Sequence, residues 1–162
     1  MKTGIVAQAF GAPYTVHSNK IIAQIASQKA QEFSAPVYTQ LDVLIKEGID
    51  VEYTYEQPGV PPPTLRMARD TVKWAKRKGF RKLWIIAAKP HLWRCIRDFT
   101  YAVQETKEQI EIHSCKEIEQ YSDSVWFCTN SKQVRTRSKW NWWSRELIIK
   151  LIPFSIYKRI AC

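Results

Sequence analysis

Two runs of consecutive apolar residues predict the buried strands of a sheet. Residues 5–10 (Ile-Val-Ala-Gln-Ala-Phe) are followed by Gly-Ala-Pro, which is typical of a strand that ends in a turn. Residues 82–88 (Lys-Leu-Trp-Ile-Ile-Ala-Ala) lack polar alternation, as expected for a strand covered on both faces. We therefore expect residues 82–88 to form a central strand.

Weaker strand signals occur at three other places. Residues 49–55 alternate apolar and polar side chains, which is typical of a strand near a sheet edge. Residues 37–40 and 110–113 are shorter candidates, and residues 125–129 form a further one in a stretch without a clear pattern.

The clearest helix is expected over residues 64–78. Its apolar side chains repeat with the helical period along one side and most of its cations lie on the other side. Thr64 is a candidate N-cap, and Gly79 is the residue type that commonly ends a helix. Similar signals predict helices over residues 19–33, 41–47, 91–105 and 140–152.

In the last of these helices, Trp140, Trp143, Leu147 and Leu151 line up on one side. The simplest interpretation is that this helix packs on the sheet, with Trp140 and Trp143 in the core.

The alternation of strands and helices predicts parallel βαβ units. We expect an α/β fold, a three-layer αβα arrangement around a mainly parallel, Rossmann-like sheet. A chain of 162 residues fits one domain, in which residues 138–162 would be a C-terminal helix and a basic, aromatic tail. Ligands bind at the carboxyl ends of the strands in such sheets, which directs attention to the loops at 10–18, 56–64 and 88–94.

The net charge of +10 is concentrated in two blocks: residues 61–100 carry +9 and residues 131–162 carry +7. Each block either forms a solvated surface or a local positive face that attracts phosphate, nucleic acid or anionic lipid. The second block mixes its cations with tryptophans, which suits a membrane interface and also stacking on single-stranded nucleic acid. A peripheral membrane factor and a nucleic-acid binder are therefore alternative functions.

The most specific candidate site follows the clearest strand, in the sequence Lys-Pro-His-Leu-Trp-Arg. His91 would lie at a helix N-terminus, and Arg94 one turn later on nearly the same face. A helix N-terminus favours anions, Arg grips phosphate or carboxylate with two donors, and His titrates near neutral pH. The alternative is structural: His91 would cap the helix and Arg94 would form an ion pair.

These residues carry a resemblance to a known family. Thr64 and Ala68, a helix that ends before an apolar strand, and then His91, Arg94 and Phe99 resemble the motifs of the bacterial YdcF/SanA/ElyC-like family. The sequence Ser-Arg-Glu-Leu at 144–147 also resembles the family's closing helix. The resemblance implies a shared α/β fold, a ligand pocket that includes Thr64, and a link to bacterial envelope biogenesis. The family has no agreed reaction.

The sequence departs from the family in the first motif. Arg66 and Met67 stand where the family usually has Glu-Asn. If Arg66 faces the pocket, it makes the site more cationic and favours binding of a highly charged anion over acid–base turnover.

We therefore expect a small anionic ligand, phosphate-like or nucleotide-like, at the carboxyl ends of the strands. His91 is the candidate catalytic residue, and whether the protein is an enzyme stays open. Gln8, Gly11 and Glu56 enter the candidate site because of their positions at strand ends, and Lys89 because it precedes His91. The expected ligand-binding set is Thr64, Arg94, Arg66, Lys89, Gln8, Gly11 and Glu56.

Several classes of protein lack support in the sequence. It has no dinucleotide-binding, P-loop or nucleophile-elbow motif, and its four cysteines show no metal-ligand spacing. No metal is expected, and no cofactor is assigned beyond a nucleotide-type ligand. The unpaired cysteines and the absence of a long apolar run favour a cytoplasmic protein, at most peripheral to the inner membrane.

Overall fold

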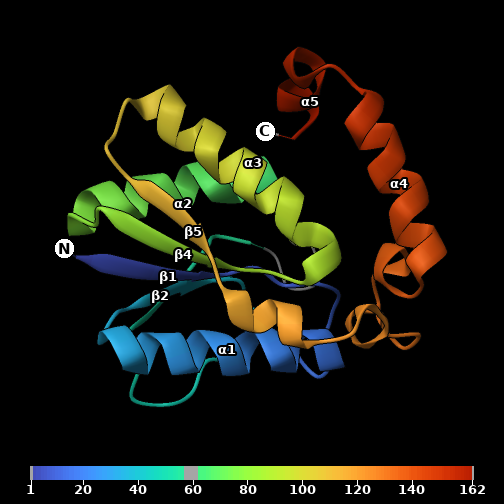
Figure 1. Ribbon diagram of the computed structural model, residues 1–162, viewed down its shortest axis with the longest axis horizontal. Coiled ribbons are helices and arrows are strands. Elements are labelled where there is room, and N and C mark those ends of the chain that lie inside the picture. Colours follow the sequence, from blue (N-terminus) through green and yellow to red (C-terminus); the bar gives the residue numbers. More distant parts are fainter. Residues whose placement is uncertain (1, 57–61, 162) are drawn as a thin grey trace.

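Five parallel strands form one sheet at the centre of the protein (Figure 1). The computed structural model describes residues 2–56 and 62–161, so residues 57–61 of the predicted loop 56–64 lie outside the described residues. The strands are β1 (Thr3–Ala7), β2 (Val37–Thr39), β3 (Val51–Tyr53), β4 (Lys82–Ile86) and β5 (Glu111–Ser114), in the order β3-β2-β1-β4-β5. The strand predicted at 82–88 is therefore inside the sheet, next to the central β1, and the strand predicted at 49–55 is at an edge.

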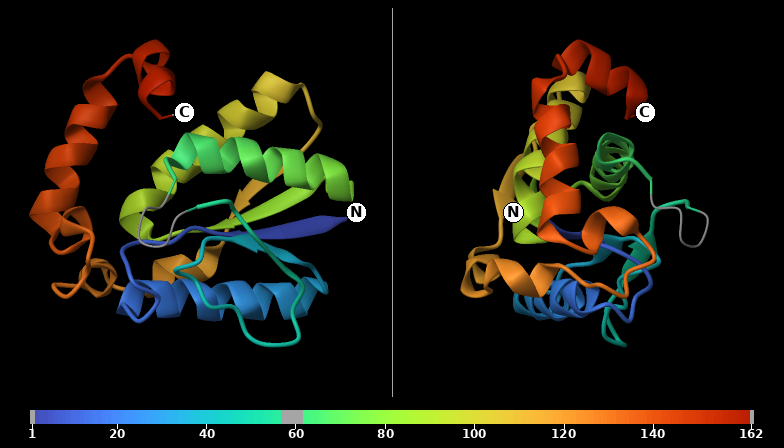
Figure 2. Two further views of the ribbon diagram at one scale, coloured as in Figure 1. Left: turned by 180° about the vertical axis from the view of Figure 1, so that it is seen from behind. Right: turned by 90° about the vertical axis from the view of Figure 1, so that its right-hand side faces the viewer.

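Helices cover both faces of this sheet, as Figures 1 and 2 show. Helix α1 (His17–Phe33) lies on one face, and helices α2 (Thr64–Lys78) and α3 (Lys89–Thr106) lie on the other. The predicted three-layer α/β, Rossmann-like fold is confirmed.

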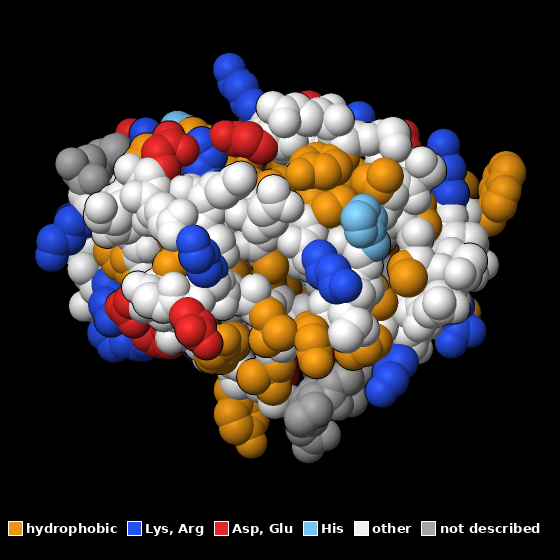
Figure 3. Space-filling view, turned by 90° about the horizontal axis from the view of Figure 1, so that it is seen from below, with side chains coloured by type: hydrophobic (Ala, Val, Ile, Leu, Met, Phe, Trp, Pro, Cys, Tyr) orange, Lys and Arg blue, Asp and Glu red, His pale blue; other side chains and the backbone are white. Residues whose placement is uncertain are grey.

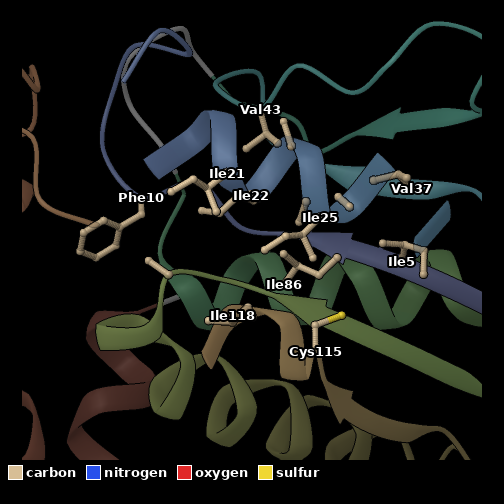
Figure 4. Close-up of a cluster of buried hydrophobic side chains, with 14 of the residues drawn as sticks. Ile5, Phe10, Ile21, Ile22, Ile25, Val37, Val43, Ile86, Cys115 and Ile118 are labelled. Atoms are coloured by element: carbon tan, nitrogen blue, oxygen red, sulfur yellow. The ribbon is translucent and has the colours of Figure 1, made fainter. Parts of the chain in front are cut away.

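Each face of the sheet contributes to a separate buried cluster, because successive strand residues point to opposite sides. Ile5 and Ala7 of β1 pack with α1, whereas Val6 packs with α2 and α3. Figure 4 shows the first cluster, in which Ile25 of α1 lies near Ile86 of β4, and Ile21 and Ile22 lie toward Phe10. Because both faces are covered, β1 and β4 need apolar residues at nearly every position, which explains the two continuous runs in the sequence.

Two predicted elements are wrong. Residues 41–47 form turns instead of a helix, because side chains elsewhere take up their backbone donors: the N–H of Leu41 donates to Glu56 and that of Lys46 donates to Ser27. Residues 125–129 are not a strand: the 3₁₀ helix η2 (Asp123–Trp126) occupies the start of this stretch. It follows η1 (Lys116–Gln120) and precedes η3 (Val134–Thr136).

The C-terminal helix α4 (Lys139–Leu151) begins as predicted, since the Ser138 hydroxyl accepts a hydrogen bond from the N–H of Asn141 at 3.2 Å. A short helix that the sequence did not predict, α5 (Phe154–Ile160), follows Pro153. Figure 1 shows α4 across the end of the sheet at which the strands finish, and α5 turned back toward α3. None of the helices described, in residues 2–56 and 62–161, is both long and apolar enough to cross a membrane.

The interpretation that Trp140 and Trp143 belong to the core is wrong. Helix α4 buries Trp142, Glu146 and Ile149, while Trp140 is 86% exposed. Two anchors fix this orientation: the Trp142 indole N–H donates to the carbonyl of Pro90 at 3.1 Å, and Glu146 pairs with Arg94. Polar partners on α3 thus decide which face of α4 turns inward.

Candidate functional site

A cavity of about 220 Å³ lies at the carboxyl ends of the central strands. The segment after β1 contributes Gln8 and Gly11, the first turn of α2 contributes Thr64, and the first turns of α3 contribute His91 and Arg94. The far wall comes from η3, α4 and α5. The cavity therefore lies at the position where parallel α/β sheets usually bind their ligands.

His91 is the centre of the polar contacts in this cavity. Its Nε2 atom lies 3.2 Å from the Thr64 hydroxyl and 3.0 Å from Nη2 of Arg94. Because a guanidinium can only donate, Nε2 accepts, and the imidazole is the neutral form with its proton on Nδ1. Burial, together with the charges of three nearby arginines, lowers the pKa of His91 well below its usual value. The site therefore holds a neutral histidine at neutral pH.

Arg94 joins this histidine to a buried carboxylate. Its Nη1 atom lies 2.6 Å from Oε1 of Glu146, and the two side chains are 5% and 0% exposed. Arg145 reaches the same oxygen at 3.4 Å. Burial raises the pKa of Glu146, although Arg94 and Arg145 act in the opposite direction. The result is a continuous chain of contacts from Thr64 through His91 and Arg94 to α4.

Arg135 and Arg145 add further positive charge to the cavity wall. Burial is the main cause that lowers the pKa of Arg135 to about 10, and the charges of Arg145 and Arg94 add to it. Among the described residues, no carboxylate lies within ion-pair distance of Arg135. Three guanidinium groups thus line the cavity, and Glu146 pairs with two of them, Arg94 and Arg145, so the described lining has an excess of positive charge.

Gly11 explains how two distant segments meet at this wall. Its φ is +101°, in the region that favours glycine, and a Cβ there would lie 2.9 Å from the Ser131 hydroxyl and 3.0 Å from that of Thr136. The backbone N–H of Ala12 also donates to the Ser131 hydroxyl at 3.3 Å. This close contact holds η3, and with it Arg135, against the end of β1.

The structure brings five of the predicted site residues around the cavity: Gln8, Gly11, Thr64, His91 and Arg94. Spacing and strand-end positions selected Gln8, Gly11, His91 and Arg94, and the family resemblance added Thr64. The amide Nε2 of Gln8, a residue that lines the cavity, is buried and has no hydrogen-bond partner among the described residues.

Three other predicted residues, Arg66, Lys89 and Glu56, lie outside the described lining of the cavity. The Lys89 ammonium lies 3.4 Å from Glu119 and 3.5 Å from Asp123. Glu56 instead accepts a hydrogen bond from the N–H of Leu41 at 2.6 Å. Arg66 is exposed, because it lies about 200° around α2 from Thr64. The hypothesis that Arg66 makes the pocket more cationic is therefore wrong, because Arg66 does not line the described cavity.

The cationic character of the site comes instead from Arg135 and Arg145, which the sequence pattern did not single out. Glu146, the carboxylate that pairs with Arg94 and Arg145, was missed as well. The only signal for the two arginines was the positive block at 131–162, which did not indicate which cations turn inward. Nothing among the described residues groups three or more His, Cys, Asp or Glu side chains in a way that could hold a metal ion. The arrangement is suited to binding an anion, with His91 able to take up a proton when negative charge arrives.

Two comparisons with known proteins identify no family and no relative for this chain. The chain matches no protein-family model, and no curated protein matches it either.

Proposed function

We propose that the cavity binds a small anion of the phosphate type, such as inorganic phosphate or a phosphate monoester. The observation that carries this proposal is the unbalanced charge: among the described residues, Glu146 pairs with Arg94 and Arg145, and Arg135 has no carboxylate within ion-pair distance. Arg135 is half-buried without a carboxylate partner, and a bound anion supplies the missing counter-charge. Arg also offers paired donors that match the geometry of a phosphate.

The size of the cavity favours a compact ligand. Pockets for drug-sized molecules usually enclose roughly 300–1,000 Å³, whereas this cavity encloses about 220 Å³. The buried amide of Gln8 and the free N–H groups at the start of α2, beside Thr64, supply additional donors. A phosphate group with a small substituent fits these dimensions better than a dinucleotide.

The histidine couples this binding to protons. Nearby arginine charges help to keep the pKa of His91 low, so a bound anion that offsets those charges raises it. Anion binding is then accompanied by proton uptake, and binding strengthens as the pH falls toward the pKa of His91 in the complex. A link to the bacterial envelope stays a prediction that rests on the sequence resemblance alone.

Calorimetry with inorganic phosphate tests the proposal. Arg135→Gln should weaken phosphate binding by about tenfold or more, the scale of one lost charged hydrogen bond. Lys132→Gln is the matched control, since it removes the same charge from an exposed position in the same segment. Titrations in two buffers of different ionisation enthalpy should show proton uptake in the wild-type protein and less of it in His91→Asn.

Two results would contradict the proposal. One is no measurable phosphate binding by the wild-type protein at low ionic strength. The other is an equal loss of affinity in Arg135→Gln and Lys132→Gln, which would show a general surface attraction and no role for the cavity.

A further inference from the structure

The outward face of α4 carries large apolar side chains. Trp140 is 86% exposed, Leu147 59% and Leu151 76%. These three lie within about 40° of one another around the helix, on the side opposite to the buried Trp142 and Ile149. Single exposed apolar residues are ordinary, but the outer face of a helix is usually polar. We call Trp140, Leu147 and Leu151 the apolar stripe.

The exposed charged side chains of the segment that carries the apolar stripe have one sign. Between residues 131 and 161 the single acidic residue is Glu146, and its side chain is fully buried. The exposed charged side chains of this segment are Lys132, Arg137, Lys139, Lys150 and Arg159. The exposed charges that this segment contributes are thus all cationic.

A groove runs along the flank of α4 next to the apolar stripe, with a volume of about 340 Å³. Lys139, Trp143 and Lys150 line it from α4, and Trp93 lines it from α3. Asp123 also lines the groove, where Lys89 lies 3.5 Å from it, so the unpaired charges in the groove are the two lysines of α4. The Lys150 ammonium lies 4.8 Å from the centre of the Trp93 ring and 5.5 Å from that of Trp143. Within the described part of the chain, no carboxylate pairs with Lys139 or Lys150.

We propose that the outer face of α4 docks on an anionic lipid surface. The apolar stripe enters the boundary between headgroups and acyl chains, and Lys139 and Lys150 meet the lipid phosphates. Tryptophan and lysine have these preferences at membrane interfaces, and an amphipathic helix with a cationic border lies in that plane. The charge complementarity between this surface and anionic lipid is the observation that selects the partner.

Other occupants fit the same surface less well. In a symmetric dimer, the cations of one copy would face those of the other, which disfavours the contact. Single-stranded nucleic acid binds proteins through aromatic rings on which its bases stack. Two of the three side chains in the apolar stripe are leucines, which offer no such platform but partition readily into lipid.

Docking in this way would bring the anion cavity close to the membrane. The opposite side of α4 supplies Trp142 and Arg145 to that cavity, so about one helix diameter, roughly 10–12 Å, separates it from the lipid. The proposal goes beyond anion binding and does not depend on it, because the apolar stripe and its lysines lie outside the cavity.

Figure 3 shows a different surface, seen from the side of α1, where charges of both signs are scattered among polar and apolar groups. This part of the molecule supplies the control positions. Leu41 and Leu44 are 41% and 54% exposed, and Lys20 and Lys46 are exposed as well.

The test is co-sedimentation of the full chain with vesicles of phosphatidylglycerol and phosphatidylcholine, compared with vesicles of phosphatidylcholine alone. The wild-type protein should bind the anionic vesicles, and added salt should weaken the binding. Leu147→Ser with Leu151→Ser should reduce it by about tenfold or more. Lys139→Gln with Lys150→Gln should reduce it by roughly fivefold for each cation removed. The control pairs, L41S with L44S and K20Q with K46Q, should bind like the wild type.

The outcomes separate the possible partners. Failure of the wild type to bind anionic vesicles overturns the proposal, as does an equal loss in the stripe variant and its control. Sedimentation as a dimer that L147S with L151S dissociates would assign the surface to a second copy. Tight binding of single-stranded RNA together with weak vesicle binding would assign it to nucleic acid. Quenching of tryptophan fluorescence by lipids labelled in the acyl chain checks the contact in the unaltered protein.

Discussion

The buried pair of Arg94 and Glu146 should make opposite contributions to folding and to anion binding. It joins α3 to α4 across 52 positions of sequence, with 2.6 Å between Nη1 and Oε1. Glu146→Gln keeps the shape of the side chain and removes its charge. We expect the free energy of unfolding to fall by about 3–5 kcal/mol, because Arg94 then stays buried without a counterion.

The distance sets the scale of this loss. Two unit charges 2.6 Å apart attract by about 6 kcal/mol at an effective dielectric constant of about 20. The Gln amide oxygen can still accept one hydrogen bond from Arg94, which returns part of that energy. The expected loss is a large fraction of the total stability of such a domain, which is about 5–15 kcal/mol. Because each kcal/mol lowers the melting temperature of a chain of this length by about 2–4 °C, the melting temperature should fall by roughly 6–20 °C.

Phosphate affinity should change in the other direction. Glu146 pairs with two of the cavity arginines, Arg94 and Arg145, so removing its charge strengthens the attraction for an anion. Urea unfolding measures the first effect and phosphate calorimetry the second. As a control, Arg94→Met combined with Glu146→Leu should lose less stability than Glu146→Gln, because no uncompensated charge remains. A stability loss below about 1 kcal/mol, or weaker phosphate binding by folded Glu146→Gln, would refute this reasoning.

Two further predictions concern other groups near the cavity. The pKa of His91 is lowered in the folded protein, so below pH 6.5 the unfolded chain takes up a proton that the folded chain does not, and stability falls as the pH drops. His91→Asn should remove this dependence, up to about 1.4 kcal/mol per pH unit, in urea unfolding at pH 7, 6 and 5; an unchanged slope would contradict the assignment. Tyr157→Phe removes a hydroxyl that donates to the buried Asp98 at 2.5 Å, and should cost about 1.5–3 kcal/mol. Hydrogen exchange should then speed up in α5, and equal exchange in both proteins would argue against this anchor.

Local sequence patterns predicted most of the fold, because the residues that begin and end its helices and strands are recognisable from their neighbours. The helix predicted at 64–78 has the bounds of α2, and Gly79 adopts the left-handed conformation, with φ of 74°, that ends a helix. The N-cap prediction for Thr64 is wrong: Pro63 occupies that position, and the Thr64 hydroxyl contacts His91 instead of a backbone N–H of the first turn. The strand at 82–88 was evident because both of its faces are covered. Segments whose conformation depends on distant partners were missed, as at residues 41–47, where Glu56 and Ser27 bind the backbone.

The orientation of α4 shows where periodicity alone fails. The helical period fits two faces of this segment: Trp140, Leu147 and Leu151 on one side, and Trp142 with Ile149 on the other. The hydrophobic pattern favoured the first face. The contact between Glu146 and Arg94 selects the second, and no local pattern reports a pairing across 52 residues.

The candidate site divides in the same way. Strand ends and helix starts predicted Gln8, Thr64, His91 and Arg94, because the topology of a parallel sheet fixes where those segments meet. The position of a residue along the chain does not determine the direction of its side chain. Lys89 therefore pairs with Glu119, and Glu56 accepts a hydrogen bond from the N–H of Leu41, instead of lining the cavity.

The walls of the cavity come from opposite ends of the polypeptide, and this bears on synthesis. Gln8 and Gly11 emerge from the ribosome early, whereas Arg135, Trp142 and Arg145 follow more than a hundred residues later. All five strands precede α4, so the sheet can assemble during translation while Arg94 still lacks its carboxylate. The anion binding proposed above would then begin only when α4 docks on α3. A nascent chain that binds the anion would therefore be one that has finished folding.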